Sequence, residues 1–148
     1  MSLAQHLSQQ HQATQRFVSV LEQERLVLVA GKIDGEQLTR LTAQKQALLL
    51  TLERLESVRR RAQIKRGYQP GARGAAQAAR DEGCLDGWSK LQETAAQAKR
   101  LNQLNGDTLL IRLQQNQRIL NVLNELSGHT LYGPDGRQRP RPTMSGLT

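Results

Sequence analysis

The stretch from Trp88 to Ser127 constrains the fold more than any other part of the chain. It contains no proline, and its only glycine is Gly106. A helix over these 40 residues would be about 60 Å long at 1.5 Å per residue. Asp86 can cap its start, and Gly128 can end it. The sequence therefore predicts one long helix along which the rest of the chain must pack.

The apolar residues of this helix form two stripes when they are placed at about 100° per residue. The first stripe comprises Trp88, Leu91, Ala95, Ala98, Asn102, Asn105, Leu109, Leu113, Asn116, Leu120 and Leu123. The second stripe, roughly 120° away, comprises Leu101, Leu104, Ile111, Ile119, Val122 and Leu126. A helix that packs on one side needs only one apolar stripe. Either this helix is buried on two sides within a bundle, or one stripe binds a helix of another chain.

Composition favours a helical fold for the whole chain. Aromatic residues make up only 3% of the sequence, and no run of alternating β-branched and aromatic residues predicts a strand. Leu, Gln, Arg and Ala dominate, and all four are good helix formers. We therefore predict an all-α fold, an antiparallel bundle of three long helices with coiled-coil-like packing. The predicted helices span about residues 2–30, 35–66 and 88–127, within a bundle domain of residues 1–128.

The two earlier helices carry their own start signals and a regular packing pattern. Ser2 can cap the first, and Asp34 can cap the second with Gln37 at the capping-box position. Apolar residues recur every three or four positions along the second helix, interrupted by Lys45 and Arg59. We expect the stems of these two side chains to pack and their charges to reach the solvent at the edge of the interface.

Glycine and proline mark the parts of the chain that we expect to be irregular. Residues 67–87 hold five glycines and Pro70, which predicts a flexible basic connection with one or two helical turns over residues 75–81. Residues 129–148 lose helical periodicity and contain a turn signal at residues 133–136. This segment is predicted to be a flexible C-terminal tail in which Leu131 and Tyr132 form one short apolar anchor.

The sequence contains no recognisable catalytic or metal-binding motif. His6 and His11 lie about 140° apart on a helix, so they cannot share a metal ion. Cys84 is the only cysteine and has no CxxC partner. Nucleotide-binding glycine patterns and the nucleophile-elbow motif are also missing. We expect a protein that is not an enzyme and that uses no cofactor or metal.

Positive charge is concentrated in one segment. The net charge is +8, and residues 59–80 alone contribute +7, because they contain seven basic residues and no acidic one. This block has one aromatic residue, Tyr68, and follows no nucleic-acid-binding pattern, so we interpret it as a solvated surface and expect no nucleic-acid partner. The longest apolar run, Leu26 to Ala30, is too short to span a bilayer. A single cysteine is typical of a reducing compartment, so we expect a cytoplasmic location.

Two asparagines interrupt the first stripe. A buried asparagine in a helical interface fixes the register of the helices at some cost in stability. We therefore interpret Asn102 and Asn105 as register-setting residues of the bundle.

Three features together resemble the FlgN family of flagellar type III export chaperones. The first is the length with an all-helical, Leu/Gln/Arg-rich layout. The second is the pairing of the early pattern Leu38-Thr39-Arg40-Leu41…Lys45…Leu48-Leu49 with the late Asn102-Gln103-Leu104-Asn105-Gly106. The third is the ending Thr130-Leu131-Tyr132-Gly133-Pro134-Asp135-Gly136. The similarity covers roughly residues 1 to 137, and the basic glycine-rich connection departs from it.

The resemblance implies a function that the spacing of the residues does not. Such chaperones bind the hook–filament junction proteins FlgK and FlgL, prevent their premature assembly and deliver them to the export gate protein FlhA. Client binding maps to the C-terminal part of the chaperone, and the tail tyrosine that docks on FlhA corresponds to Tyr132. The second stripe would line the client groove: Leu101, Leu104, Ile111, Ile119, Val122 and Leu126.

Two alternatives from other classes remain open at this point. A structural homodimer would pair the second stripe with its own copy. A helical nucleic-acid-binding protein would use the basic residues between Arg59 and Arg80, and its binding would depend steeply on salt.

Overall fold

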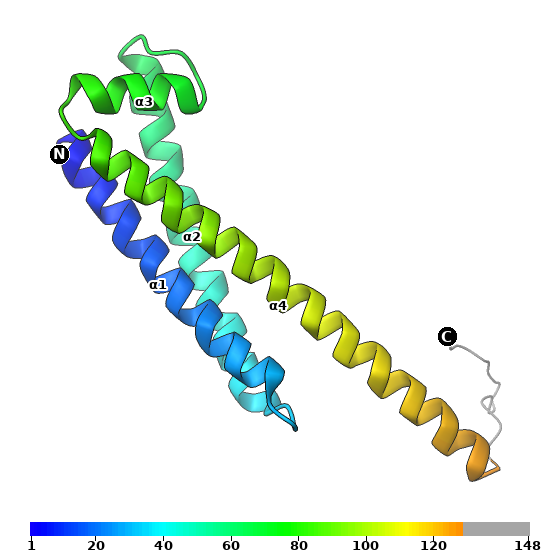
Figure 1. Cartoon of the computed structure of the whole chain (residues 1–148). Coiled ribbons are helices and arrows are strands. Elements are labelled where there is room, and N and C mark those ends of the chain that lie inside the picture. Colours follow the sequence, from blue (N-terminus) through cyan, green and yellow to red (C-terminus); the bar gives the residue numbers. More distant parts are fainter. Residues whose placement is uncertain (129–148) are drawn as a thin grey trace. The chain divides into compact units, whose positions relative to one another are not determined.

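The computed structural model describes residues 1–128, and this part of the chain contains four helices and no strand (Figure 1). The helices are α1 (Leu3–Val29), α2 (Gly35–Lys65), α3 (Ala72–Asp81) and α4 (Leu85–Leu126). The all-α prediction is therefore confirmed, whereas the expected count of three helices is corrected to four. The additional helix, α3, lies within residues 67–87, where the sequence predicted a flexible connection with only one or two helical turns over residues 75–81.

Side chains cap the first two helices as their sequences predict. Ser2 accepts a hydrogen bond from the backbone N–H of Gln5, and the Gln5 side chain accepts one from the backbone of Ser2, which completes a capping box. Asp34 accepts a hydrogen bond from the backbone N–H of Gln37 at 3.1 Å. These bonds satisfy N–H groups that the first turn of a helix otherwise leaves without partners.

The long helix α4 begins earlier than its sequence suggests. The prediction of Asp86 as its N-cap is wrong, because α4 starts at Leu85 and the backbone N–H of Trp88 donates to the carbonyl of Cys84. Asp86 lies instead in the first turn, where its negative charge is favoured by the helix dipole. The end is as predicted: Gly128 follows the last turn with a φ of 75°, a left-handed conformation that glycine adopts readily.

Helix α3 forms because glycines bound it and small side chains let it pack closely. Gly71, with a φ of 91°, precedes the helix, and Gly83, with a φ of 72°, follows it. Its buried residues, Gly74, Ala75, Ala78 and Ala79, recur at helical spacing and form one face. An alanine at position 74 would place its Cβ only 1.7 Å from the carbonyl oxygen of Gln69. The glycines that suggested flexibility therefore serve turns and one close backbone approach.

The chain divides into two compact units, residues 1–105 and residues 106–148. The division falls within α4, between Asn105 and Gly106. The sequence placed its own boundary at residue 128, and the tail beyond it lies outside the described residues. The first unit contains α1, α2, α3 and the first half of α4, and the described part of the second unit is the second half of α4.

Within the first unit, α1 and α2 form an antiparallel hairpin and lie side by side (Figure 1). Near the start of α1, the Nε2 of His6 lies 2.9 Å from the carbonyl oxygen of Leu55. Near the end of α1, Lys45 Nζ lies 3.2 Å from both carboxylate oxygens of Glu24. Residue numbers therefore rise along α1 while they fall along α2, as the sequence predicted for these two helices.

Two buried apolar clusters join α4 to this hairpin. The first contains residues of α1, α3 and α4: Leu7, Ala75, Ala79, Trp88 and Leu91. The second contains residues of α1 and α4: Val18, Leu21 and Ala98. Both α1 and α4 contribute to the two clusters, and α1 also packs along α2, so α1 forms the centre of the first unit.

A polar network connects α4 to both helices of the hairpin near Asn105, the last residue of the first unit. Asn105 is 1% exposed, and its Nδ2 donates to the carbonyl of Leu21 and to Glu24, both at 2.9 Å. Lys45 Nζ, which pairs with Glu24, also donates to Asn102 at 3.0 Å. A shift of α4 by one residue would break these bonds and leave buried polar groups without partners. The interpretation of the two asparagines as register-setting residues therefore has a structural basis in this network.

Candidate functional site

The second half of α4 carries apolar side chains that remain exposed to solvent. Five of the six second-stripe residues are exposed: Leu104 by 46%, Ile111 by 54%, Ile119 by 57%, Val122 by 53% and Leu126 by 79%. The sixth, Leu101, is partly buried against the cluster of Val18, Leu21 and Ala98. Of the predicted binding residues, Leu101 therefore has the least surface left for a partner.

The first stripe is buried only along its first half. Trp88, Leu91, Ala98 and Asn105 are buried within the first unit. Beyond Asn105, Leu113, Leu120 and Leu123 of the same stripe are exposed by about half. The described part of the second unit is one helix, so it has no other helix of its own to cover either stripe. Both stripes are thus candidate binding surfaces over residues 107–126.

A groove of about 470 Å³ runs between α2 and α4, with α1 as its floor. The floor is formed by Gln10, Thr14 and Phe17; the α2 wall by Leu49, Leu52 and Glu56; the α4 wall by Trp88, Leu91, Gln92, Ala95, Ala98, Lys99 and Asn102. It exists because α1 and α2 pack closely along their length, whereas α2 and α4 do not. The sequence predictions did not include this groove, since periodicity alone does not give the distance between two helices.

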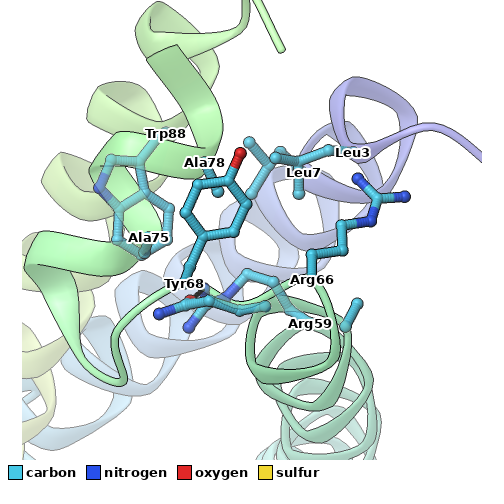
Figure 2. A pocket seen from close by; sticks show the side chains of 10 residues that line it. Leu3, Leu7, Arg59, Arg66, Tyr68, Ala75, Ala78 and Trp88 are labelled. Atoms are coloured by element: carbon cyan, nitrogen blue, oxygen red, sulfur yellow. Dashed lines mark hydrogen bonds between the residues drawn. The ribbon is translucent and has the colours of Figure 1, made fainter. Parts of the chain in front are cut away.

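A much smaller cavity, of about 30 Å³, lies in the first unit where α3 packs against the other helices (Figure 2). Side chains from α1, α2, α3 and α4 line it together with Tyr68 from the connection between α2 and α3. Sites for small-molecule ligands usually measure about 300–1,000 Å³, whereas this space suits about one or two waters. The cavity is therefore a packing feature of the core rather than a substrate site.

Several residues of the basic block have structural roles. Arg59 is 7% exposed, pairs with Glu56 at 2.8 Å and lies 4.8 Å from the centre of the Trp88 ring. Arg66 pairs with Glu82 at 3.2 Å. The prediction that the charges of Lys45 and Arg59 reach solvent is wrong for Arg59, whose side chain is 7% exposed, whereas the Lys45 side chain pairs with Glu24 and is 23% exposed. Part of the block therefore stabilises the fold, which weakens the case for a nucleic-acid surface.

Within residues 1–128, three titratable groups have shifted pKa values. Burial raises the pKa of Glu56, but hydrogen bonds from Arg59 and Gln10, with the charges of Arg59 and Arg60, outweigh it and lower the value below 4.5. The hydrogen bond that Tyr68 donates to Asp81 raises the pKa of its phenol. Burial and the charge of Glu82 raise the pKa of the Cys84 thiol, which makes a reactive thiolate less abundant.

His6 and His11, which were predicted not to share a metal ion, contact different helices. His6 contacts Leu55 of α2, and the Nε2 of His11 lies 3.0 Å from the hydroxyl of Thr94 of α4. Within residues 1–128, no three His, Cys, Asp or Glu side chains gather closely enough to hold a metal ion. In the same part of the chain, no helix has the length and apolar character needed to cross a membrane. Tyr132, the predicted gate-docking residue, lies outside the described residues.

The chain is similar to known proteins over most of its length. A family model described as FlgN protein matches residues 1–140. Relatives named Flagella synthesis protein FlgN include one from Salmonella typhimurium, 33% identical, covering 91% of this chain and 89% of the relative. Another from Escherichia coli K12 is 31% identical, covering 91% and 88%. One from Proteus mirabilis is 30% identical, covering 97% and 94%. No solved structure matches the chain. The chain therefore belongs to the FlgN family.

Proposed function

We propose that the protein is a cytoplasmic chaperone of flagellar type III export. It binds the hook–filament junction proteins FlgK and FlgL, prevents their premature assembly and delivers them to the export gate protein FlhA. Membership of the FlgN family and the names of the relatives support the flagellar role. The clients, the gate and the docking role of Tyr132 rest on the family resemblance. Binding and delivery of this kind require no catalytic group.

The observation that carries the proposal is the exposed apolar surface of α4 after Asn105. Eight large apolar residues there are exposed: Leu110, Ile111, Leu113, Ile119, Leu120, Val122, Leu123 and Leu126. Contiguous apolar surface on a soluble protein commonly marks a binding site. An amphipathic client helix can cover such a stripe with residues spaced three and four apart. We therefore assign the second stripe, from Leu101 to Leu126, to client binding.

The energy available from this stripe sets a limit on affinity. Complete burial of a large apolar side chain contributes about 1.5–3 kcal/mol, and roughly half or more of the surface of the five exposed second-stripe side chains remains to be covered. The six residues together would then supply on the order of 5–10 kcal/mol before the cost of ordering the partner. Micromolar binding needs about 8 kcal/mol net of those costs. The second stripe alone therefore gives at most weak binding, and a tight complex needs additional buried surface.

A charge in the middle of the second stripe should prevent client binding. Replacing both Ile119→Asp and Val122→Asp removes two apolar contacts and would bury two carboxylates under the client helix. We expect the affinity for FlgK, measured by calorimetry, to fall about 100-fold or more. Circular dichroism should show unchanged helicity, because both side chains are more than half exposed.

The matched control places the same charges on apolar surface elsewhere. Leu26 and Val29 of α1 are 71% and 50% exposed and are also three residues apart. The variant with Leu26→Asp and Val29→Asp should bind FlgK as the unmodified protein does. Full FlgK binding by the Ile119/Val122 variant would contradict the assignment of the stripe.

A further inference from the structure

The groove between α2 and α4 is long enough to bind one helix of about four turns. Two contacts between its walls mark its ends: Arg59 over Trp88 at 4.8 Å, and Lys45 to Asn102 at 3.0 Å. The end residues lie 14 positions apart on both helices, which corresponds to about 21 Å at 1.5 Å per residue. A helix of about four turns would fill that length. The groove belongs wholly to the first unit, residues 1–105.

The lining favours a helical occupant over an extended peptide. Both walls and the floor are helices, whose backbone groups are already hydrogen-bonded to each other. An extended chain would bury its own N–H and C=O groups against them without partners, whereas a helix satisfies these groups internally. Ala95 and Ala98 on the α4 wall are small, so the backbone of an incoming helix can approach closely. Leu49, Leu52 and Phe17 offer it apolar contacts.

The two ends of the groove differ in polarity, which indicates how an occupant would lie. At the Trp88 end, Gln10 is 5% exposed, and its Oε1 has no hydrogen-bond partner among the described residues. The carboxylate of Glu56 lies at the same end, where its charge is paired with Arg59, and Lys99 lies toward the other end. A helix carries free N–H donors and partial positive charge at its N-terminus, and partial negative charge at its C-terminus. Its N-terminus would therefore lie near Gln10 and Glu56.

We infer that this groove binds a second part of the client: an amphipathic helix of about 14 residues with its N-terminus at the Trp88 end. The inference rests on the proposed function and extends it from the end of α4 to the first unit. The α4 wall belongs to the first stripe, which continues in sequence as Leu109, Leu113, Leu120 and Leu123. A client helix that covers that stripe also supplies the additional buried surface that the second stripe lacks.

Each wall of the groove offers a matched pair of variants for the test. On α2, Leu49 lines the groove and is 41% exposed, whereas its neighbour Leu50 does not line it and is 62% exposed. On α4, Ala95 lines the groove and its neighbour Ala96 does not, although both are exposed. We compare Leu49→Asp with Leu50→Asp, and Ala95→Arg with Ala96→Arg. Because all four side chains are exposed, the variants should fold, which circular dichroism checks.

Trp88 provides a direct signal, because it is the only tryptophan of the chain and lies at one end of the groove. A tryptophan-free synthetic peptide of the FlgK C-terminal helix is titrated into the full-length protein. We expect a saturable change in Trp88 fluorescence and about 10-fold or greater loss of affinity for Leu49→Asp and Ala95→Arg. Leu50→Asp and Ala96→Arg should change the affinity less than about two-fold, a difference of about 0.4 kcal/mol.

The outcomes separate the groove from the proposed function. If the Ile119/Val122 variant loses FlgK but both groove variants keep it, the client uses only the end of α4, and the groove inference is wrong. If the unmodified protein itself does not bind FlgK, the proposed function fails; if it binds FlgK and every variant binds it equally well, the assignments of both the stripe and the groove are wrong. Equal losses in groove variants and their controls would also overturn the inference, since the effect would not depend on the groove.

Two further results would contradict the inference in other ways. A nitroxide quencher attached to the peptide should quench Trp88 more strongly from the N-terminus than from the C-terminus, and the reverse would overturn the orientation. A Trp88 signal that depends on protein concentration without peptide, with a dimer in light scattering, would assign the groove to a second copy of the chain instead of the client.

Discussion

The carboxylate of Glu56 links α2 to α1 and, through Arg59, to α4. It accepts hydrogen bonds from the Nε and Nη2 of Arg59 at 2.9 and 2.8 Å and from Gln10 at 3.1 Å. The same guanidinium lies over Trp88. The ionised form of Glu56 is therefore the form that the folded protein binds best, which explains why its pKa is lowered.

Stability should fall in acid partly because of this one carboxylate. The unfolded chain takes up a proton near pH 4.5, while folded Glu56 stays ionised to lower pH. Its contribution is therefore complete above pH 4.5 and is lost as the pH falls through the lowered folded pKa. Replacing Glu56→Gln should flatten the decrease in unfolding free energy below that pH, measured by urea denaturation.

The control for this prediction is Glu53→Gln, an exposed carboxylate three residues earlier on the same helix. The unmodified protein and this control should lose stability with the same slope in acid. If Glu56→Gln follows that slope as well, Glu56 does not contribute to the acid dependence.

The contacts of individual residues also show which interactions can be predicted from the sequence. The caps at Ser2 and Asp34 were predictable, because their partners lie three residues away in the chain. Lys45 and Arg59 were predicted to reach solvent, since nothing local marks Glu24 or Trp88 as their partners. Long-range polar contacts depend on how helices pack, which the chain's local pattern does not specify.

Among the helices, α3 is the one whose packing depends most on a single position, Gly74, where there is no room for a side chain. The connection before α3 is held by Gln63, whose Nε2 donates to the carbonyl oxygens of Gln69 and Gly71. Gly74 of α3 lies directly against this connection, with Gln69 so close that a Cβ would overlap its backbone. The docking of α3, which covers Leu7 and Trp88, therefore requires glycine at position 74.

Gly74→Ala should destabilise the protein, because the backbone of the connection must move to accommodate the methyl group. We expect a loss of about 1–3 kcal/mol or more in the free energy of unfolding, the usual range for overpacking. Gly87→Ala is the matched control: it lies in the first turn of α4 with nothing within 4 Å of its Cβ position. That change should be neutral or stabilise by about 0.5–1 kcal/mol. Equal stabilities in urea denaturation would contradict this account of α3.

The long helices were predictable as elements, α3 was predicted only as one or two helical turns, and the groove was not predicted. Periodic leucines over many turns placed α1, α2 and α4 within three residues of their observed bounds. The glycines in and around α3 favoured a flexible connection over a helix in the sequence analysis, although the alanines at 75, 78 and 79 have helical spacing. The two stripes of α4 were visible in sequence, but how far each is buried depends on the packing of helices that are distant in the chain, such as the contact of Asn105 with Leu21.

On the scale of the whole molecule, the two units differ in what they bury. Residues 1–105 contain both apolar clusters and the network around Asn105. The described part of residues 106–148 is a single helix whose large apolar side chains, apart from Leu109, are exposed. An isolated helix gains little stability from its own backbone, since most helical stability in proteins comes from packing. Residues 107–126 should therefore become much more stable when a client covers them.

Hydrogen–deuterium exchange of the full-length protein, alone and bound to FlgK, would measure this stabilisation along the chain. Exchange reports the local free energy of opening along the chain. In the free protein, amides of residues 107–126 should exchange much faster than those of α1 around Leu21, which lies in the core. Binding of FlgK should slow exchange across residues 107–126 by about 10-fold or more. Unchanged exchange there in a saturated complex would contradict the account.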